Sequence, residues 1–256
     1  MNKVSFIDKH PVISSIVATF LFLLVITFGG IISGITEIRS EITLIIAFAI
    51  LAVILIAFIS KMNKWNYYGF NSMNKMDNTT KLLFIPLFIF AFLPLVVGFS
   101  ADLKLLEIIY IIVFMAIVSF VEETMFRGVI LRLLQKKSNM YAIWGSSLLF
   151  SIPHLLNTLN GKGSVEAIVQ TLFAFFIGLI LAMLMIKTNN IFPLIIYHFT
   201  NNTVSSVTRS DVNQSFELYF TLIIFALSIV YAIYLYNLIK RDSRSSEKEA
   251  FSQINF

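Results

Sequence analysis

Hydrophobic residues occur along this chain in long, almost unbroken runs that short polar segments separate. The runs are rich in Ile, Leu, Phe, Val and Ala, and they lack the apolar and polar alternation typical of barrel strands. A helix needs about 20 apolar residues to cross a bilayer. The sequence therefore predicts eight transmembrane helices, at 12–35, 42–59, 82–99, 105–134, 142–156, 165–186, 191–207 and 216–239.

Two of these segments, 142–156 and 191–207, are short and carry polar residues, so a plain hydropathy scan could miss either one. The fourth is long enough to be tilted or to emerge from the bilayer. No soluble domain is expected, and the polar tail from Lys240 is predicted to be disordered. We divide the chain into N-terminal helices (1–104), a core with the candidate chemistry (105–207) and a last helix with its tail (208–256).

Composition supports the membrane prediction. Hydrophobic residues make up 58% of the 256 residues and charged residues 13%, and the mean hydropathy is +0.86. These values lie outside the range of ordinary soluble domains. The fold class predicted is an all-α integral membrane protein, a bundle of about eight transmembrane helices with the lipid bilayer as its solvent. The absence of cysteine excludes disulfides and a cysteine nucleophile.

The positions of Lys and Arg test the helix count, because short cytoplasmic loops carry the excess of positive charge. With eight helices and both termini cytoplasmic, the outer loops hold only Arg39, Lys104, Lys162 and Arg209. The net charge of +5 then needs no nucleic-acid partner, since inner basic residues beside anionic lipid explain it. The inner segments hold Lys3, Lys9, Lys61, Lys64, Lys75, Lys81, Arg132, Lys136, Lys137, Lys187, Lys240, Arg241, Arg244 and Lys248.

Ionisable side chains within a membrane are costly, by about 2.5–3.5 kcal/mol each on insertion scales, so each is a candidate functional residue. Here they fall on three predicted helices. The candidates are Glu122, Glu123 and Arg127 on the fourth helix, His154 on the fifth, and His198 with Asn201 and Asn202 on the seventh.

The fourth helix carries its polar residues in the run VEETMFRG. Glu123 and Arg127 are four residues apart and share a helix face, where a charge pair can form. Glu122 is turned about 100° away. One carboxylate can therefore be held by Arg127 while the other acts on water. The alternative is a charge cluster that only holds helices together, with Arg127 extended towards the cytoplasmic surface.

The other two helices repeat the four-residue spacing. Phe150 precedes His154 by four residues, and Pro153 can kink this helix. His198 and Asn202 share one face. Either histidine could instead be a packed hydrogen-bonding residue, and Asn201 and Asn202 could join helices through hydrogen bonds.

Together these groups suit the hydrolysis of a peptide bond. A carboxylate and a histidine that share a water molecule make a general base, and a second histidine with an Asn amide offers donors to an oxyanion. The soluble zinc signature HExxH is absent. Glu122, His154 and His198 could nevertheless ligate Zn²⁺, so a zinc cofactor stays open.

The three motifs, Glu122-Glu123-x-x-x-Arg127, Phe150-x-x-x-His154 and His198-x-x-x-Asn202, resemble those of the CAAX protease and bacteriocin-processing (Abi) family of intramembrane proteases. The resemblance covers about 105–207 and implies an eight-helix architecture. It implies that Glu122 and His154 activate water and that His198 and Asn202 stabilise the oxyanion. Glu123 and Arg127 would then organise the site.

The resemblance also implies a substrate class. The expected substrate is a membrane-associated peptide or protein precursor, because the Ile-, Phe-, Asn- and Lys-rich composition is typical of an A+T-rich bacterial genome, in which prenylated substrates are not expected. The expected location is then a bacterial plasma membrane. Two alternatives are a transporter that uses the buried polar residues as an ion relay and a membrane scaffold without proteolytic activity.

Overall fold

The computed structural model describes residues 6–36, 38–158, 164–209 and 214–254. Its regular elements are helices, apart from an isolated bridge between Phe99 and Thr208. The helices are α1 (Phe6–Lys9), α2 (Pro11–Thr36), α3 (Ser40–Met62), η1 (Met73–Lys75), α4 (Asn78–Leu82), α5 (Ile85–Phe92), η2 (Leu93–Val97), α6 (Leu105–Glu123), η3 (Thr124–Ile130), α7 (Leu131–Gln135), α8 (Asn139–Ser151), η4 (Ile152–Thr158), α9 (Ser164–Thr188), α10 (Phe192–Val207) and α11 (Gln214–Ile254).

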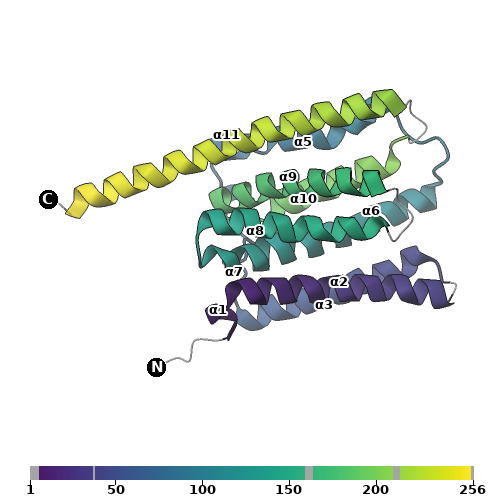
Figure 1. The fold of residues 1–256 in the computed structure, drawn as a ribbon, viewed down its shortest axis with the longest axis horizontal. Helices are drawn as coiled ribbons and strands as arrows, with labels where there is room; N and C mark the ends of the chain where they lie inside the picture. Colours follow the sequence, from purple (N-terminus) through teal and green to yellow (C-terminus); the bar gives the residue numbers. More distant parts are fainter. Residues whose placement is uncertain (1–5, 37, 159–163, 210–213, 255–256) are drawn as a thin grey trace.

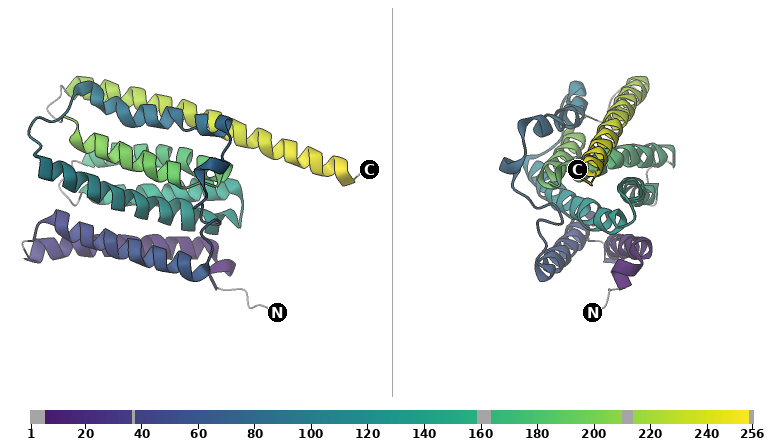
Figure 2. Two further views of the ribbon diagram at one scale, coloured as in Figure 1. Left: turned by 180° about the vertical axis from the view of Figure 1, so that it is seen from behind. Right: turned by 90° about the vertical axis from the view of Figure 1, so that its left-hand side faces the viewer.

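The long helices lie side by side along one direction and form a bundle (Figures 1 and 2). The α2–α3 hairpin covers one side and α5 with α11 the opposite side, while α6 to α10 fill the middle. Helix α1 and the far end of α11 lie at the same end of the bundle. This arrangement agrees with an even number of crossings.

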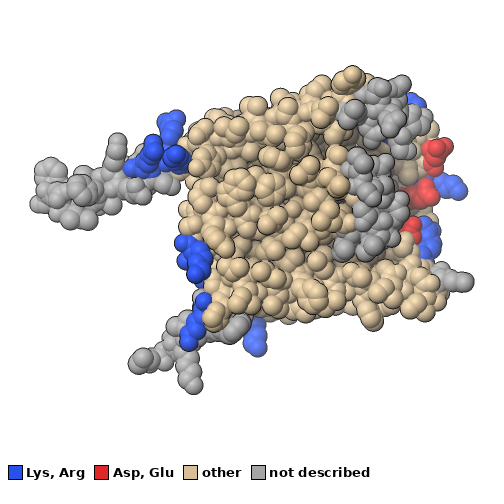
Figure 3. All heavy atoms as spheres, viewed as in Figure 1, with Lys and Arg blue, Asp and Glu red and all other residues tan. Residues whose placement is uncertain are grey.

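Six helical stretches are long and apolar enough to cross a membrane: Pro11–Thr36, Ser40–Met62, Asn78–Val97, Leu105–Gln135, Ala167–Thr188 and Tyr219–Asp242. Many of their large hydrophobic side chains are exposed on the outside of the bundle. On the face shown in Figure 3, the charged side chains lie at the two ends, and the described residues of the middle are uncharged. The chain is therefore a polytopic membrane protein, as the sequence predicts.

The two predicted segments that do not meet this criterion are the short ones. Helix α8 has 13 residues and α10 has 16. Both lie in the middle of the bundle, against α9 and α6 respectively. Helices α8 and α9 approach closely at Gly178, where an added Cβ would lie 3.1 Å from the Cβ of Ser147. Small residues at such crossings let two backbones approach.

Three predicted elements differ in detail from the structure. The fourth predicted helix contains a π-helical stretch, η3, between α6 and α7. In the fifth, the α-helix ends at Ser151 and continues as the 3₁₀ helix η4. Pro153 explains this change, because its ring lacks the N–H that an α-helical hydrogen bond needs. The third is divided into α5 and η2, and its first residue, Leu82, is the last residue of α4.

The prediction of a disordered tail from Lys240 is wrong as far as Ile254, because α11 continues to that residue. The tail sequence after Asp242 contains Glu247, Lys248, Glu249 and Ala250. These residue types favour the helix. The polarity of the segment therefore marks where the helix leaves the apolar part of the bundle rather than where it ends.

Candidate active site

A buried ion pair joins Glu123 and Arg127 on the same helix. Oε1 of Glu123 lies 3.2 Å from Nη1 of Arg127, and both side chains are fully buried. The pair predicted from the four-residue spacing is therefore confirmed. Breaking such a pair leaves an unpaired charge in an apolar environment, which typically costs about 3–5 kcal/mol.

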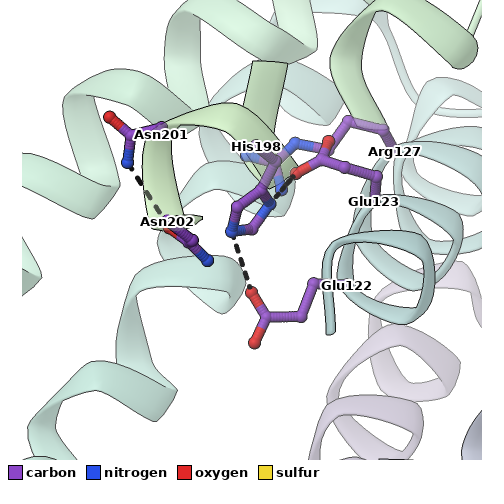
Figure 4. A network of polar contacts seen from close by, with 6 residues as sticks. All are labelled: Glu122, Glu123, Arg127, His198, Asn201 and Asn202. Atoms are coloured by element: carbon purple, nitrogen blue, oxygen red, sulfur yellow. Dashed lines mark hydrogen bonds and ion pairs between the residues drawn. The ribbon is translucent and has the colours of Figure 1, made fainter. Parts of the chain in front are cut away.

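His198 of α10 bridges to both glutamates of α6 (Figure 4). Its Nδ1 lies 2.8 Å from Oε1 of Glu123, and its Nε2 lies 3.6 Å from Oε2 of Glu122. A carboxylate that is paired with Arg127 can only accept hydrogen bonds, so Nδ1 of His198 carries the hydrogen and donates it. The other ring nitrogen is left to face Glu122.

The two neighbouring glutamates have different environments. The side chain of Glu123 is fully buried, whereas that of Glu122 is 13% exposed. The distance from Glu122 to His198 is longer than a hydrogen bond. Glu122 is thus the carboxylate outside the Arg127 pair, as the helix geometry predicts. Its contact is with His198, whereas the family resemblance paired it with His154 for water activation.

Directly after the glutamates the chain forms the π-helix η3, which contains Arg127. The N–H of Leu131 bonds to the carbonyl of Phe126, five residues earlier. A π-helical turn adds a residue to the helix and is often found at functional sites. Here it separates the regular helix that carries Glu122 and Glu123 from α7.

Phe150 of α8 lies at the centre of the site. The guanidinium carbon of Arg127 lies 3.9 Å from the centroid of its ring, and the rings of His154 and His198 meet it edge-on at 5.5 and 5.8 Å. Within the described residues, Nε and Nη2 of Arg127 have no hydrogen-bond partner, so the aromatic face offers these donors a favourable contact. The sequence analysis assigned no role to Phe150, although this residue belongs to the motif Phe150-x-x-x-His154.

The candidate groups line a partly enclosed pocket of about 80 Å³ between η4, α9 and α10. His154, His198, Asn201 and Asn202 all contribute to its lining. Nδ2 of Asn201 lies 3.4 Å from Oδ1 of Asn202. Figure 4 shows the amide nitrogen of Asn202 turned towards the space between His198 and Glu122. Every predicted residue thus lines this pocket or directly contacts a residue that lines it: Glu122 and Glu123 contact His198, and Arg127 contacts Phe150.

A zinc site would need Glu122, His154 and His198 to converge on one point. Among the described residues, no group of three or more His, Asp or Glu side chains is placed to hold a metal ion. Glu122 and His198 lie together, and Nδ1 of His198 is occupied by Glu123. The set Glu122, His154 and His198 does not fit a metal in this structure.

A segment from outside the core contacts α7 and the α9–α10 turn at the end of the bundle that holds α1. We call residues 66–71, between α3 and η1, the strap. Arg132 of α7 donates from Nε to the carbonyl of Tyr67 at 2.9 Å and also bonds to Oδ1 of Asn189, in the α9–α10 turn. The exposed fraction of Arg132 is 8%. The sequence placed this residue among the basic residues of the inner segments, and the structure shows that it is buried and joins two other segments.

The strap also bonds to the α9–α10 turn directly. The amide of Asn71 donates to the carbonyl of Asn189 at 2.7 Å, and that of Asn190 donates to the carbonyl of Asn71 at 3.0 Å. The N–H of Ile191 donates to the carbonyl of Gly69 at 2.8 Å. Gly69 has a φ of 93°, a backbone conformation that favours glycine. These bonds fix the start of α10, the helix that carries His198.

Fold and site define a class: a polytopic helical membrane protein with a buried cluster of carboxylates, Arg and His facing a pocket. Residues 104–204 match the family described as type II CAAX prenyl endopeptidase, Rce1-like. This part of the chain is therefore a domain of that protease family, as the three motifs predicted. No curated protein and no solved structure gives a significant match. The matched segment contains all seven candidate residues. Our division of the chain into three parts stays a prediction.

Proposed function

We propose that this protein is an intramembrane endopeptidase that hydrolyses a peptide bond of a membrane-associated protein or peptide precursor. The observation that carries the proposal is the placement of His198 between Glu123 and Glu122 at the edge of a pocket. A structural ion pair needs only Glu123 and Arg127. A second, partly exposed carboxylate beside the ring adds a group that can exchange a proton with water.

In the proposed mechanism Glu122, assisted by His154, removes a proton from a water molecule as the water oxygen attacks the carbonyl carbon of the scissile bond. The carbonyl oxygen becomes an oxyanion, which accepts hydrogen bonds from the amide of Asn202 and from Nε2 of His198, whose ring carries a hydrogen on both nitrogens in this step. The C–N bond then breaks, and the proton held by Glu122 passes to the leaving nitrogen. Glu123 and Arg127 position His198 throughout.

The experiment compares the peptides of a strain that lacks the gene with those of strains that express wild type or Glu122→Gln. Peptides that appear only with wild type are expected. Glu107→Gln is the matched control, since Glu107 lies at the other end of α6 and is exposed. A peptide set that does not depend on Glu122 would favour a transporter or scaffold instead.

We further propose that both termini are cytoplasmic and that the protein resides in a bacterial plasma membrane. The distribution of Lys and Arg supports this orientation. Reporter fusions after Lys61, Lys137, Lys187 and Lys240 should report the cytoplasm, and fusions near Glu37, Lys162 and Arg209 the outside. Two successive fusions with inverted results would contradict the topology.

A further inference from the structure

One face of α9 forms a wall of the pocket. The residues at positions 170, 173, 174, 177 and 181 line it, and their spacing of three and four residues places them on one side of the helix. None of them belongs to the three motifs. The wall consists of Gln170, Phe173, Ala174, Ile177 and Leu181.

This wall faces the candidate catalytic groups. The opposite lining comes from α10, with His198, Asn201 and Asn202, and from η4, with His154. Close contact between α8 and α9 brings Phe150 to the same wall, since an added Cβ at Gly178 would lie 3.4 Å from its ring. A peptide bond placed beside His198 and Asn202 would therefore share the pocket with the α9 face.

The size of the pocket limits that side chain. Its volume is about 80 Å³, whereas an engineered cavity that binds benzene measures about 150 Å³. Apart from Gln170, the α9 side of the lining is apolar, which favours an apolar group on that side of the pocket. Ala174 has the smallest side chain of the wall. A larger side chain at this position would fill part of the pocket.

We propose that the α9 face is the substrate-binding wall of this protease and that Ala174 admits one small apolar side chain beside the scissile bond while excluding an aromatic ring. This inference rests on the proposed function. Gln170 is the polar member of the wall, and an amide side chain can both donate to and accept from a peptide backbone. It serves to position the substrate backbone.

The size limit can be tested without a known substrate, because the chain contains no cysteine. Single-cysteine variants Ala174→Cys and Leu172→Cys would be reacted in detergent with methyl and benzyl methanethiosulfonate. Leu172 lies two residues away and is 47% exposed on the outside of the bundle. The ratio of the methyl rate to the benzyl rate should be at least about tenfold higher at position 174, where a ring would overpack the pocket.

Equal ratios at the two positions would overturn the size limit, whether or not the protein is a protease. The specificity role is tested with palmitoylated peptides in which one central residue is Ala, Val, Leu, Phe or Trp. Wild type should cleave those with Ala, Val or Leu, Ala174→Phe should lose Val and Leu, and Leu172→Phe should behave as wild type. An unchanged profile in Ala174→Phe would refute the specificity role.

If wild type and Glu122→Gln treat all the peptides alike, the proposed function fails, and the labelling ratios still decide the size of the pocket. Gln170→Ala is expected to raise KM more than it lowers kcat, because the substrate backbone loses a contact that it makes before the reaction. Thr171→Val, the neighbouring change on α9, is the control. A fall in kcat alone would contradict the positioning role. Size-exclusion profiles and thermal unfolding establish that each variant is folded.

Discussion

Nδ1 of His198 lies 2.8 Å from Oε1 of Glu123, and this contact joins α10 to α6 in the interior of the bundle. The same carboxylate oxygen accepts from Arg127. Glu123 therefore holds two partners, one on its own helix and one on another. This relationship separates the roles of the two neighbouring glutamates.

Glu122→Gln should lower cleavage by at least about 10² while folding is retained, because the amide keeps the shape but cannot take a proton. Glu123→Gln should cost stability as well, since Arg127 loses its charge partner in a buried site, at about 3–5 kcal/mol. Thermal unfolding and cleavage in nanodiscs measure both effects. Adding Arg127→Gln should recover part of the stability of Glu123→Gln and none of the activity of Glu122→Gln. The reverse pattern would exchange the two assignments.

Asn201 and Asn202 form a matched pair of adjacent residues. Asn202→Ala should reduce kcat by about 10²–10³, the usual effect of removing one oxyanion donor. Asn201→Ala should have a much smaller effect, because its amide acts on the substrate through Asn202. Single-turnover rates would measure the difference. Equal losses of kcat in Asn201→Ala and Asn202→Ala would contradict the assignment of the oxyanion donor to Asn202 rather than to Asn201.

Phe150→Leu should destabilise the protein and reduce activity together, because the ring contacts Arg127, His154 and His198. Phe150→Ala is expected to cost about 3–5 kcal/mol, as for other buried aromatic residues. Phe20→Leu is the control, since Phe20 is 58% exposed on the outside of the bundle. Thermal unfolding is the measurement, and a Phe150→Leu variant as stable as the control would refute the central role of the ring.

The strap predicts a role for Arg132 outside the motifs. Arg132→Gln should lower kcat more than it raises KM, because the start of α10 loses a restraint that positions His198. Arg132→Lys should not restore activity, since a lysine cannot reproduce the two-directional contacts of a guanidinium group. Lys137→Gln, at an exposed position nearby, is the control. If Arg132→Lys retained the activity, a positive charge at this position would be sufficient, and the proposed role of the guanidinium contacts would be wrong.

The donor geometry leads us to expect hydrolysis without a bound zinc ion. Activity of the purified protein should survive chelation, because Glu122, His154 and His198 are not grouped as ligands. Metal analysis and cleavage would be measured on the same sample. Stoichiometric zinc, with activity lost on chelation and restored by zinc, would contradict this expectation.

The sequence by itself determined the elements and the residues that share a face. Apolar runs predicted each long helix because a bilayer selects for length and hydrophobicity. The short helices α8 and α10 carry polar residues and fail the same criterion, as predicted. The Glu123–Arg127 pair followed from spacing alone, since residues four apart meet on any α-helix.

Only the tertiary structure decided which helices meet and at what rotation. Sequence spacing could not show that His198 faces both glutamates, that Phe150 lies between Arg127 and the histidines, or that the α9 face closes the pocket. The π-helix and the strap were missed for the same reason. A helix fixes the directions of its own side chains, but its depth and rotation relative to a neighbour depend on packing between residues far apart in the chain.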